Sequence, residues 1–402
     1  MRKLALQLTL AALAALPTFA QKPEKPPKRP KLEAMADTND AREYMDYGFK
    51  KFDDDPEAAA SAFYWAARIN PDNAEAYYAR RAALILDDNR LLSTYIDGST
   101  HDKETLKPYR ALDTLELRAT LLNPFLYRRL EARIFTDYIG GLNHMSPGDA
   151  QLHYVINTYL QNAGASTRAW VAYSDGDFDT ALEQYATAMK GDKQPASTHL
   201  ERARIFGMRA QTDSAVAEFK SALDELRKKD AKSLVFVYDS KATIEHSIGM
   251  LLEGHDRPAE AREAYGRALQ EDVSFYPAHV RLGMLALGAK DSTTAVSELD
   301  LAAQIAPNEP YVRYTYGYTL AALGKRPEAL TQINKAIELD PYYPLPYVTL
   351  AEIQEKNGDH ASARAAYQAY LKHAGKQDPQ RTDVEAKLLA MAPQTGGAGQ
   401  PR

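Results

Sequence analysis

The sequence contains no cysteine among its 402 residues. This absence excludes disulfide bonds, thiolate metal sites, cysteine nucleophiles and covalently attached c-type haem. A lipoprotein is excluded for the same reason, because its acyl chains need a cysteine at the cleavage site. An exported protein of this size without disulfides fits a bacterial periplasm or cell surface better than a eukaryotic secretory route.

Motifs for catalysis and metal binding are also missing. The sequence has no G-x-S-x-G, no H-E-x-x-H, no glycine-rich phosphate loop and no EF-hand pattern. Its nine histidines are scattered, with no pair at i and i+4. The aspartates at 53–55 are consecutive, whereas calcium needs ligands at spaced positions, so we interpret them as an acidic helix N-terminus before Pro56. We expect no enzyme activity, no metal and no cofactor.

Neither sign of charge is in large excess. The chain has 49 basic and 54 acidic residues, for a net charge of −5. Nucleic acid is therefore not expected as a partner, because phosphate binding needs a concentrated basic surface. Hydrophobic residues make up 45% of the chain and charged residues 26%, so most of it can bury a core.

A long apolar run occurs only at the N-terminus. Residues 1–20 combine a basic start, an apolar run and small residues before a cleavage point, as secretory signal peptides do. A membrane anchor is the alternative, but the run is shorter than the ~20 residues that a span needs. We expect cleavage after Ala20, which leaves 47 basic and 54 acidic residues, a net charge of −7 and no membrane span.

Both flanks of the remaining chain are poor in apolar residues. Residues 21–36 are rich in proline and lysine and are predicted to form an extended linker, with docking on anionic lipid or cell wall as the alternative. Residues 392–402 are predicted to be a disordered tail. Nearly everything between them has helical periodicity, and we interpret the β-branched run at 233–238 as the start of a long helix.

An octet pattern recurs along the helical part. In "ALTQINKA", residues 329–336, alanine comes first and eighth and a large apolar residue comes fifth. Related octets begin at positions 59, 181, 215, 261, 295 and 363. The steps from 181 to 215 and from 261 to 363 are 34 residues each. The step from 215 to 261 is 46 residues, which predicts longer helices around 224–250.

This period and pattern resemble the tetratricopeptide repeat, a helix–turn–helix unit of 34 residues. Gly249, Gly283 and Gly317 stand twelve residues before three of the octets, where the family has a small residue in the first helix. Pro307 and Pro341 match the terminating proline of the family. The resemblance implies an all-α superhelix, or α-solenoid, with one concave and one convex face. The turns within its units are marked by Gly176, Asp256, Gly324 and Gly358.

The same comparison divides the chain into segments. They are N-terminal repeat-like hairpins at 37–87, a divergent helical segment at 88–161, an array of about six units at 162–375 and a capping helix at 376–391. Residues 88–160 are either degenerate repeats or a helical insert. A capping box of Thr382 and Glu385 is predicted at the start of the capping helix.

In this family the first helix of each unit forms most of the concave surface. Carried over by register, the predicted partner-binding residues of the groove are Trp170, Tyr173, Leu200, Arg204, His246, Met250, Val280, Met284, Tyr314, Tyr318, Val348 and Glu352. The alternative for several of them is packing between neighbouring units. None is lysine or asparagine and Arg204 is the one fixed cation, so an aromatic-lined groove is favoured over a clamp for a C-terminal carboxylate.

Together these features predict an exported, non-catalytic scaffold or adaptor that binds a protein or peptide of unknown identity in its concave face. One alternative is an envelope-assembly subunit that docks to the cell wall or to outer-membrane machinery. Another is an enzyme or ligand-binding site within 88–160, built from His101, His144 or His153, with the repeats as a platform.

Overall fold

The computed structural model describes residues 25–88, 91–92, 103–146, 148–191, 195–229 and 240–391. These residues form nineteen α-helices and no strand, which confirms the all-α solenoid prediction. The predicted signal peptide, the predicted C-terminal tail and the β-branched run at 233–238 lie outside the described residues.

Helices in the N-terminal part pack in sequence order, α2 on α3, α3 on α4, and α4 on α6. The helices of this part are α2 (Ala41–Lys51), α3 (Pro56–Ile69), α4 (Ala74–Asp87), α6 (Lys103–Leu122), α7 (Glu131–Leu142) and α8 (Leu152–Asn162).

From residue 165 to residue 373 the helices form consecutive hairpins, and α21 (Arg381–Ala390) follows the last one. The pairs are α9 (Ala165–Ser174) with α10 (Phe178–Met189), α11 (Pro195–Met208) with α12 (Thr212–Lys229), α13 (Lys241–Gly254) with α14 (Pro258–Glu271), α15 (Tyr276–Gly288) with α16 (Ser292–Ile305), α17 (Pro310–Ala322) with α18 (Arg326–Leu339), and α19 (Leu345–Lys356) with α20 (His360–His373). The division of the chain into domains at the boundaries given above stays a prediction.

Each of these hairpins turns through one residue in the left-handed conformation. Asp256, one of the predicted turn residues, has a φ of 56°, and Ala210 and Lys290 have φ values of 55° and 61°. Glycine adopts this conformation without a steric penalty, which explains its use in the other three turns. Those turns contain Gly176, Gly324 and Gly358, with φ values of 84°, 76° and 79°.

The two helices of a unit approach each other most closely at the predicted small residues. A Cβ atom on Gly249 would lie 2.4 Å from the ring of Tyr265, and one on Gly317 would lie 2.8 Å from Ile333. Side chains do not pack at such distances, so only glycine permits these contacts. The small residue and the large residue of the pattern are therefore the two sides of one contact that recurs along the array.

Two predictions about helix ends are wrong. The helix α12 is longer than its neighbours, with 18 residues, but α13 begins only at Lys241. The extended Ser240 caps α13 by accepting a hydrogen bond from the backbone N–H of Thr243, so no helix continues from 233–238 into α13. The helix α21 begins at Arg381, one residue before Thr382, and its N-cap makes no side-chain hydrogen bond. The predicted capping box is therefore absent.

The segment that precedes α2 is held against the fold. The indole N–H of Trp65 donates to the carbonyl of Pro27 at 3.1 Å. Arg29 donates to the Tyr44 hydroxyl at 2.7 Å, and its guanidinium lies 4.9 Å from the centre of the Trp65 ring. Arginine stacks well on aromatic rings, which ties this segment to α2 and α3. The prediction of an extended linker at 21–36 is therefore wrong for its described part.

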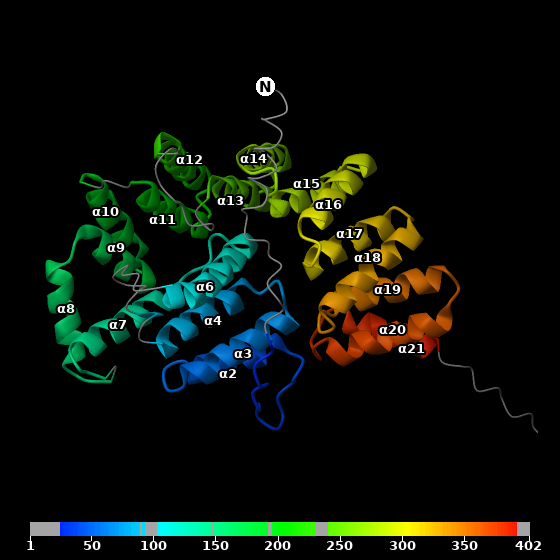
Figure 1. The fold of residues 1–402 in the computed structure, drawn as a ribbon, viewed down its shortest axis with the longest axis horizontal. Coiled ribbons are helices and arrows are strands. Elements are labelled where there is room, and N and C mark those ends of the chain that lie inside the picture. Colours follow the sequence, from blue (N-terminus) through cyan, green and yellow to red (C-terminus); the bar gives the residue numbers. More distant parts are fainter. Residues whose placement is uncertain are drawn as a thin grey trace, which may run out of the picture.

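The superhelix closes on itself. In Figure 1 the helices α8 to α20 curve around the blue and cyan helices α2 to α6, and α19 and α20 end next to α2 and α3. The Asn39 amide donates to the carbonyl of Lys372 at 2.7 Å, and the backbone N–H of Lys376 donates to Asp37 at 2.6 Å. These partners lie 333 and 339 positions apart in the sequence.

Aromatic and ionic contacts continue this closure. The rings of Trp65 and Tyr342 pack edge to face with their centres 5.4 Å apart. Arg68 pairs with Asp340 at 3.4 Å, and its guanidinium lies over the Tyr342 ring. We call the contacts of residues 37–42 and 65–68 with residues 340–342 and 372–377 the closure seam.

Gly249→Ala is expected to destabilise the protein by about 1–3 kcal/mol, the usual range for a core that is overpacked by one group. Gly254→Ala in the same helix is the matched control, because a Cβ there would meet nothing within 4 Å. Urea unfolding of both variants measures the difference. An equal effect of the two substitutions would contradict the close-contact explanation.

A disulfide between Asp40→Cys and Gly375→Cys is expected to form across the closure seam. A Cβ on Gly375 would lie 3.6 Å from the Cα of Asp40, which suits disulfide geometry, and the chain has no other cysteine. Oxidation should stabilise this variant by about 2–4 kcal/mol relative to its reduced form. A double variant that stays reduced under oxidising conditions would show that the ring is open in solution.

Candidate functional site

The concave face of the first hairpins in the array is occupied by the chain itself. Residues 123–131 connect α6 to α7 and enter this face, and we call them the inserted segment. The ring of Phe125 packs on Phe219 with the ring centres 6.0 Å apart. It also fills the space beside Gly207, where a Cβ would lie 2.1 Å from the ring.

Tyr173, a predicted groove residue, binds the backbone of the inserted segment. Its hydroxyl accepts a hydrogen bond from the N–H of Arg128 at 3.2 Å and donates to the carbonyl of Leu126 at 3.3 Å. The Tyr127 ring packs edge to face on the Tyr173 ring. The inner face therefore holds an extended polypeptide, and that polypeptide is the chain's own.

Arg204, the one fixed cation among the predicted groove residues, is buried in an ionic cluster. It pairs with Glu201 on its own helix. Arg128 of the inserted segment pairs with Glu116 of α6, and Arg81 of α4 lies 3.4 Å from the same carboxylate. Although burial favours its neutral form, the nearby arginines hold the pKa of Glu116 below its usual value. These cations are balanced within the fold, so they are poor candidates for binding a ligand carboxylate.

Five of the twelve predicted groove residues are buried, so the prediction of an exposed groove is wrong for them. Tyr173 and Arg204 lie under the inserted segment or in the ionic cluster, and Leu200 packs in the core between hairpins. The other two border an internal pocket. The five are Tyr173, Leu200, Arg204, His246 and Val280.

The other seven predicted residues keep some accessible surface. Trp170 packs on Phe135 and Tyr314 packs on Tyr343, with ring centres 5.6 and 5.3 Å apart. Tyr318 is exposed. The remaining half-buried residues are Met250, Met284, Val348 and Glu352, the last of which pairs with Lys387 at 3.2 Å.

Three predicted residues, His246, Met250 and Val280, come together around a pocket of about 290 Å³. We call it the central pocket. It lies where α4 and α6 face the first helices α13, α15 and α17. Its other lining residues are Pro71, Asp72, Tyr77, Arg118, Leu121, Leu122, Tyr276, Pro277, Arg281, Glu309 and Tyr311. Both the N-terminal helices and the array form its walls, so the pocket depends on closure of the ring.

The charges around the central pocket are largely paired. Arg118 donates to Glu309 at 2.9 Å, and Arg281 lies 2.6 Å from Glu253. The attraction of Glu309 raises the pKa of Arg118, and burial raises the pKa of Asp72. Since each arginine already has a carboxylate partner, the pocket favours an uncharged group over a free C-terminal carboxylate.

His246 gives the pocket an unsatisfied hydrogen-bonding atom. Its ring packs between Tyr265 and Phe275, with ring centres 5.3 and 5.5 Å apart, and the residue is 2% exposed. Burial, followed by the nearby Arg281 cation, lowers the pKa of His246 to about 3, so the imidazole is neutral. Its Nδ1 atom makes no hydrogen bond to any described residue. Buried polar atoms normally have a partner, so a bound group would supply the missing bond.

Sequence reasoning missed most of the walls of this pocket. Tyr311 precedes Tyr314 by three residues and Tyr318 by seven, so helical periodicity could have placed it on the same face of α17. No sequence signal could have found Tyr77 or Arg118, because they reach the pocket only through closure of the ring.

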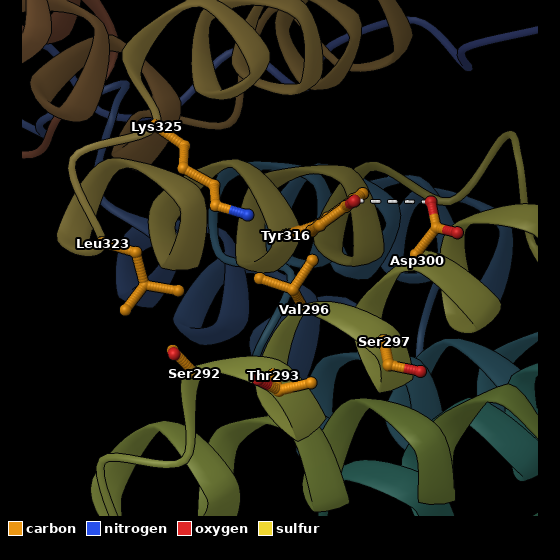
Figure 2. Close-up of a pocket in the computed structure, with 8 residues that line it drawn as sticks. All are labelled: Ser292, Thr293, Val296, Ser297, Asp300, Tyr316, Leu323 and Lys325. Atoms are coloured by element: carbon orange, nitrogen blue, oxygen red, sulfur yellow. Dashed lines mark hydrogen bonds between the residues drawn. The ribbon is translucent and has the colours of Figure 1, made fainter.

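A second hollow, of about 520 Å³, lies between α16 and α17 and is drawn in Figure 2. The Tyr316 hydroxyl points toward Asp300 there, at 3.4 Å, and Ser292 and Thr293 lie along the opposite side. None of the predicted groove residues lines this hollow. It is the junction of two consecutive units, and its short hydroxyl side chains select no particular ligand, so we assign no site to it.

The alternative of a catalytic or ligand site within 88–160 has no support in the described residues. His144 and His153 are exposed, and His101 lies outside the described residues. Within the described ranges, no three His, Asp or Glu side chains are grouped so that they could hold a metal. None of the helices in those ranges combines the length and apolar character that crossing a membrane requires.

The family model of the tetratricopeptide repeat matches residues 247–310 and 314–381. The chain contains tetratricopeptide repeats. Such repeats build protein–protein interaction scaffolds, generally without catalysis, and those of this chain suggest a scaffold of the same kind.

Two curated relatives share the repeats. Hsp70-Hsp90 organizing protein 2 of Arabidopsis thaliana is 25% identical over 228 residues, which cover 50% of this chain and 40% of that protein. A TPR repeat-containing protein of Pseudomonas aeruginosa is 32% identical over 138 residues, which cover 34% of this chain and 55% of that protein. The chain thus spans about half the length of the curated relatives that it matches.

Solved repeat structures are more distant. YrrB, described as a TPR protein with an unusual peptide-binding site, is 19% identical with a TM-score of 0.40, over 52% of this chain and 100% of YrrB. The pilF protein of Pseudomonas aeruginosa is also 19% identical with a TM-score of 0.40, over 48% of this chain and 83% of that one.

Asp113→Asn is expected to stabilise the protein at pH 8 but not at pH 4. Burial raises the pKa of Asp113 to about 6, against the attraction of Arg81 and with the repulsion of Glu116. A carboxyl whose pKa is raised on folding loses stability as the pH rises from its unfolded value through the folded one. Asparagine is uncharged throughout, so the advantage of the variant should appear between about pH 4 and 6.

Thermal melting of both proteins across this pH range measures the effect. The exposed Asp54→Asn is the control and should change the melting temperature little at any pH. An advantage of Asp113→Asn that does not vary with pH would contradict the assignment of a raised pKa.

Proposed function

We propose that this chain is an exported, non-catalytic scaffold that holds a segment of a partner protein in the central pocket. The observation that carries the proposal is the buried His246 on the wall of this pocket, with a ring nitrogen that has no partner among the described residues. A ligand that enters the pocket gains a hydrogen bond which the folded chain does not make by itself.

The inserted segment supports a polypeptide as the ligand. Its backbone is held by the Tyr173 hydroxyl, which accepts from one residue of the extended segment and donates to another. Tyr276 and Tyr311 bring further tyrosines from the first helices α15 and α17 to the central pocket. A tyrosine ring offers an apolar surface together with a hydroxyl that donates and accepts, which suits contacts with both side chains and backbone.

The size and charge of the pocket narrow the ligand further. Its volume of about 290 Å³ is close to the lower limit of about 300 Å³ for ligand pockets, so it accommodates one or two side chains. Arg118 and Arg281 are already paired with carboxylates. We therefore propose an internal segment that inserts one large, uncharged side chain, rather than a free C-terminus.

Export is proposed from the N-terminal sequence. Residues 1–20 have the composition of a secretory signal peptide, and the lack of cysteine fits the periplasm or surface of a bacterium. No observation on the described residues favours the envelope-assembly or enzymatic alternatives over this proposal.

Met250→Lys is expected to weaken binding of the partner at least ten-fold, or about 1.4 kcal/mol, because it places an unpaired charge in the pocket wall. The partner is first captured in cells with a photo-crosslinking residue at Tyr311, and binding of the captured segment is then measured by calorimetry. A crosslinker at Thr293, in the hollow of Figure 2, is the control position and should not capture the same partner.

Met284→Lys is the matched control for the binding measurement. Met284 stands 34 residues after Met250, at the same position of the next repeat, but it does not line the pocket. Equal binding by the two variants would contradict the pocket assignment. In the same cells, the captured protein should come from the envelope fraction and begin at Gln21, and a cytoplasmic chain that keeps residues 1–20 would contradict export.

A further inference from the structure

Away from the central pocket, the α7–α8 region exposes large apolar side chains. Leu142, Tyr154 and Tyr159 are 60%, 75% and 44% exposed, and Leu152 is the one buried residue of α8. These side chains border a groove of about 480 Å³, which we call the α7–α8 groove. Its lining residues are Ile139, Leu142, Asn143, Tyr154, Val155, Thr158, Tyr159, Asn162 and Ala163. Exposed apolar surface of this kind marks an interaction site more often than a solvated surface.

The α7–α8 groove carries no charge. None of its lining residues is ionisable except the two tyrosines. Between Asp137 and Arg168 the sequence has a single aspartate, glutamate, lysine or arginine, namely Asp149, although such residues make up 26% of the chain. The absence of lysine and arginine also disfavours an anionic membrane surface, which attracts basic helices.

We infer that the α7–α8 groove is the contact between two copies of this chain related by a twofold axis. In such a contact the same patch meets itself, so a charge near the axis would face a like charge. A patch without charges avoids this repulsion. A partner with a different surface would impose no such restriction, and contacts between unlike proteins commonly use complementary charges.

The polar groups of the groove are also suited to pairing with themselves. The amides of Asn143 and Asn162, the Thr158 hydroxyl and the tyrosine hydroxyls each contain both a donor and an acceptor. Some of their donors are used within the helices, for example by Thr158, whose hydroxyl donates to the carbonyl of Tyr154 at 2.9 Å. The oxygen acceptors face no like-charge conflict when the same groups approach across a twofold axis.

One anchor of the proposed contact is held in position. The ring of Tyr159 packs edge to face on Phe135, with the ring centres 5.6 Å apart, and Phe135 in turn packs on Trp170. A side chain that is ordered before binding loses less entropy in the contact. Trp170, predicted from the sequence as a groove residue, thus supports this second surface from beneath.

Sedimentation velocity of the purified protein over a wide dilution series tests the inference. The protein is expected to be a dimer that dissociates on dilution. Tyr154→Asp and Tyr154→Lys should each weaken self-association at least about ten-fold, because each brings two like charges together at the axis. An equimolar mixture of the two variants should restore the dimer, since opposite charges then face each other.

The controls separate this contact from others. Val273 is 69% exposed but lies between α14 and α15, so Val273→Asp should leave the dimer unchanged. Circular dichroism melting of each variant shows that it is folded. A wild-type protein that is monomeric at every concentration would overturn the inference. So would a dimer that both Tyr154 variants retain, or a mixture of the two variants that fails to re-form it.

Discussion

In each unit of the array, a large side chain of the second helix fills the space left by a small residue of the first. Gly249 and Tyr265 are one such pair, and Gly317 and Ile333 are another. The closeness of this contact sets how the two helices of a unit lie, and its repetition sets how successive units stack. A regular stack of this kind curves, and here the curve is complete enough for the last hairpin to meet the first helices. The closure seam and the central pocket both depend on that curvature.

Closure changes what the concave face can do. An open repeat array offers its whole inner surface to a partner, whereas this chain fills the first part of that surface with its own residues 123–131. The Tyr173 hydroxyl and the space beside Gly207 are used for this purpose. What remains is an enclosed pocket with walls from both halves of the chain. The proposed ligand is therefore a small part of a partner, such as one side chain with its adjoining backbone, rather than a long peptide laid along the groove.

Charge is distributed in a way that separates the three surfaces of the molecule. Buried arginine–glutamate pairs join α4, α6 and the inserted segment to the array, and the closure seam uses ion pairs together with one aromatic contact. The central pocket contains charges that are already paired, and the α7–α8 groove contains none. Ionic contacts thus hold the fold together, while the surfaces proposed for binding rely on aromatic and neutral polar groups.

Much of the fold could be predicted from local patterns. The 34-residue period, the turn at Asp256 and the small residue at Gly249 each reflect a contact within one unit, so they are visible in a short stretch of sequence. The candidate site was predicted less well. His246 and Met250 were placed on the correct inner face, but Tyr173 and Arg204 were expected to be open and are covered. Their cover comes from residues about 45 to 120 positions away, with no periodic signal to connect them.

The sequence by itself determined that the chain is an all-helical solenoid, because each unit repeats the same short-range packing requirement. It also determined which face of each first helix turns inward. Only the tertiary structure decided that the solenoid closes, that its own inserted segment fills part of the concave face, and that Tyr77 and Arg118 complete the central pocket. Those outcomes depend on the sum of small rotations over many units, and on contacts between residues more than 300 positions apart, which no local pattern encodes.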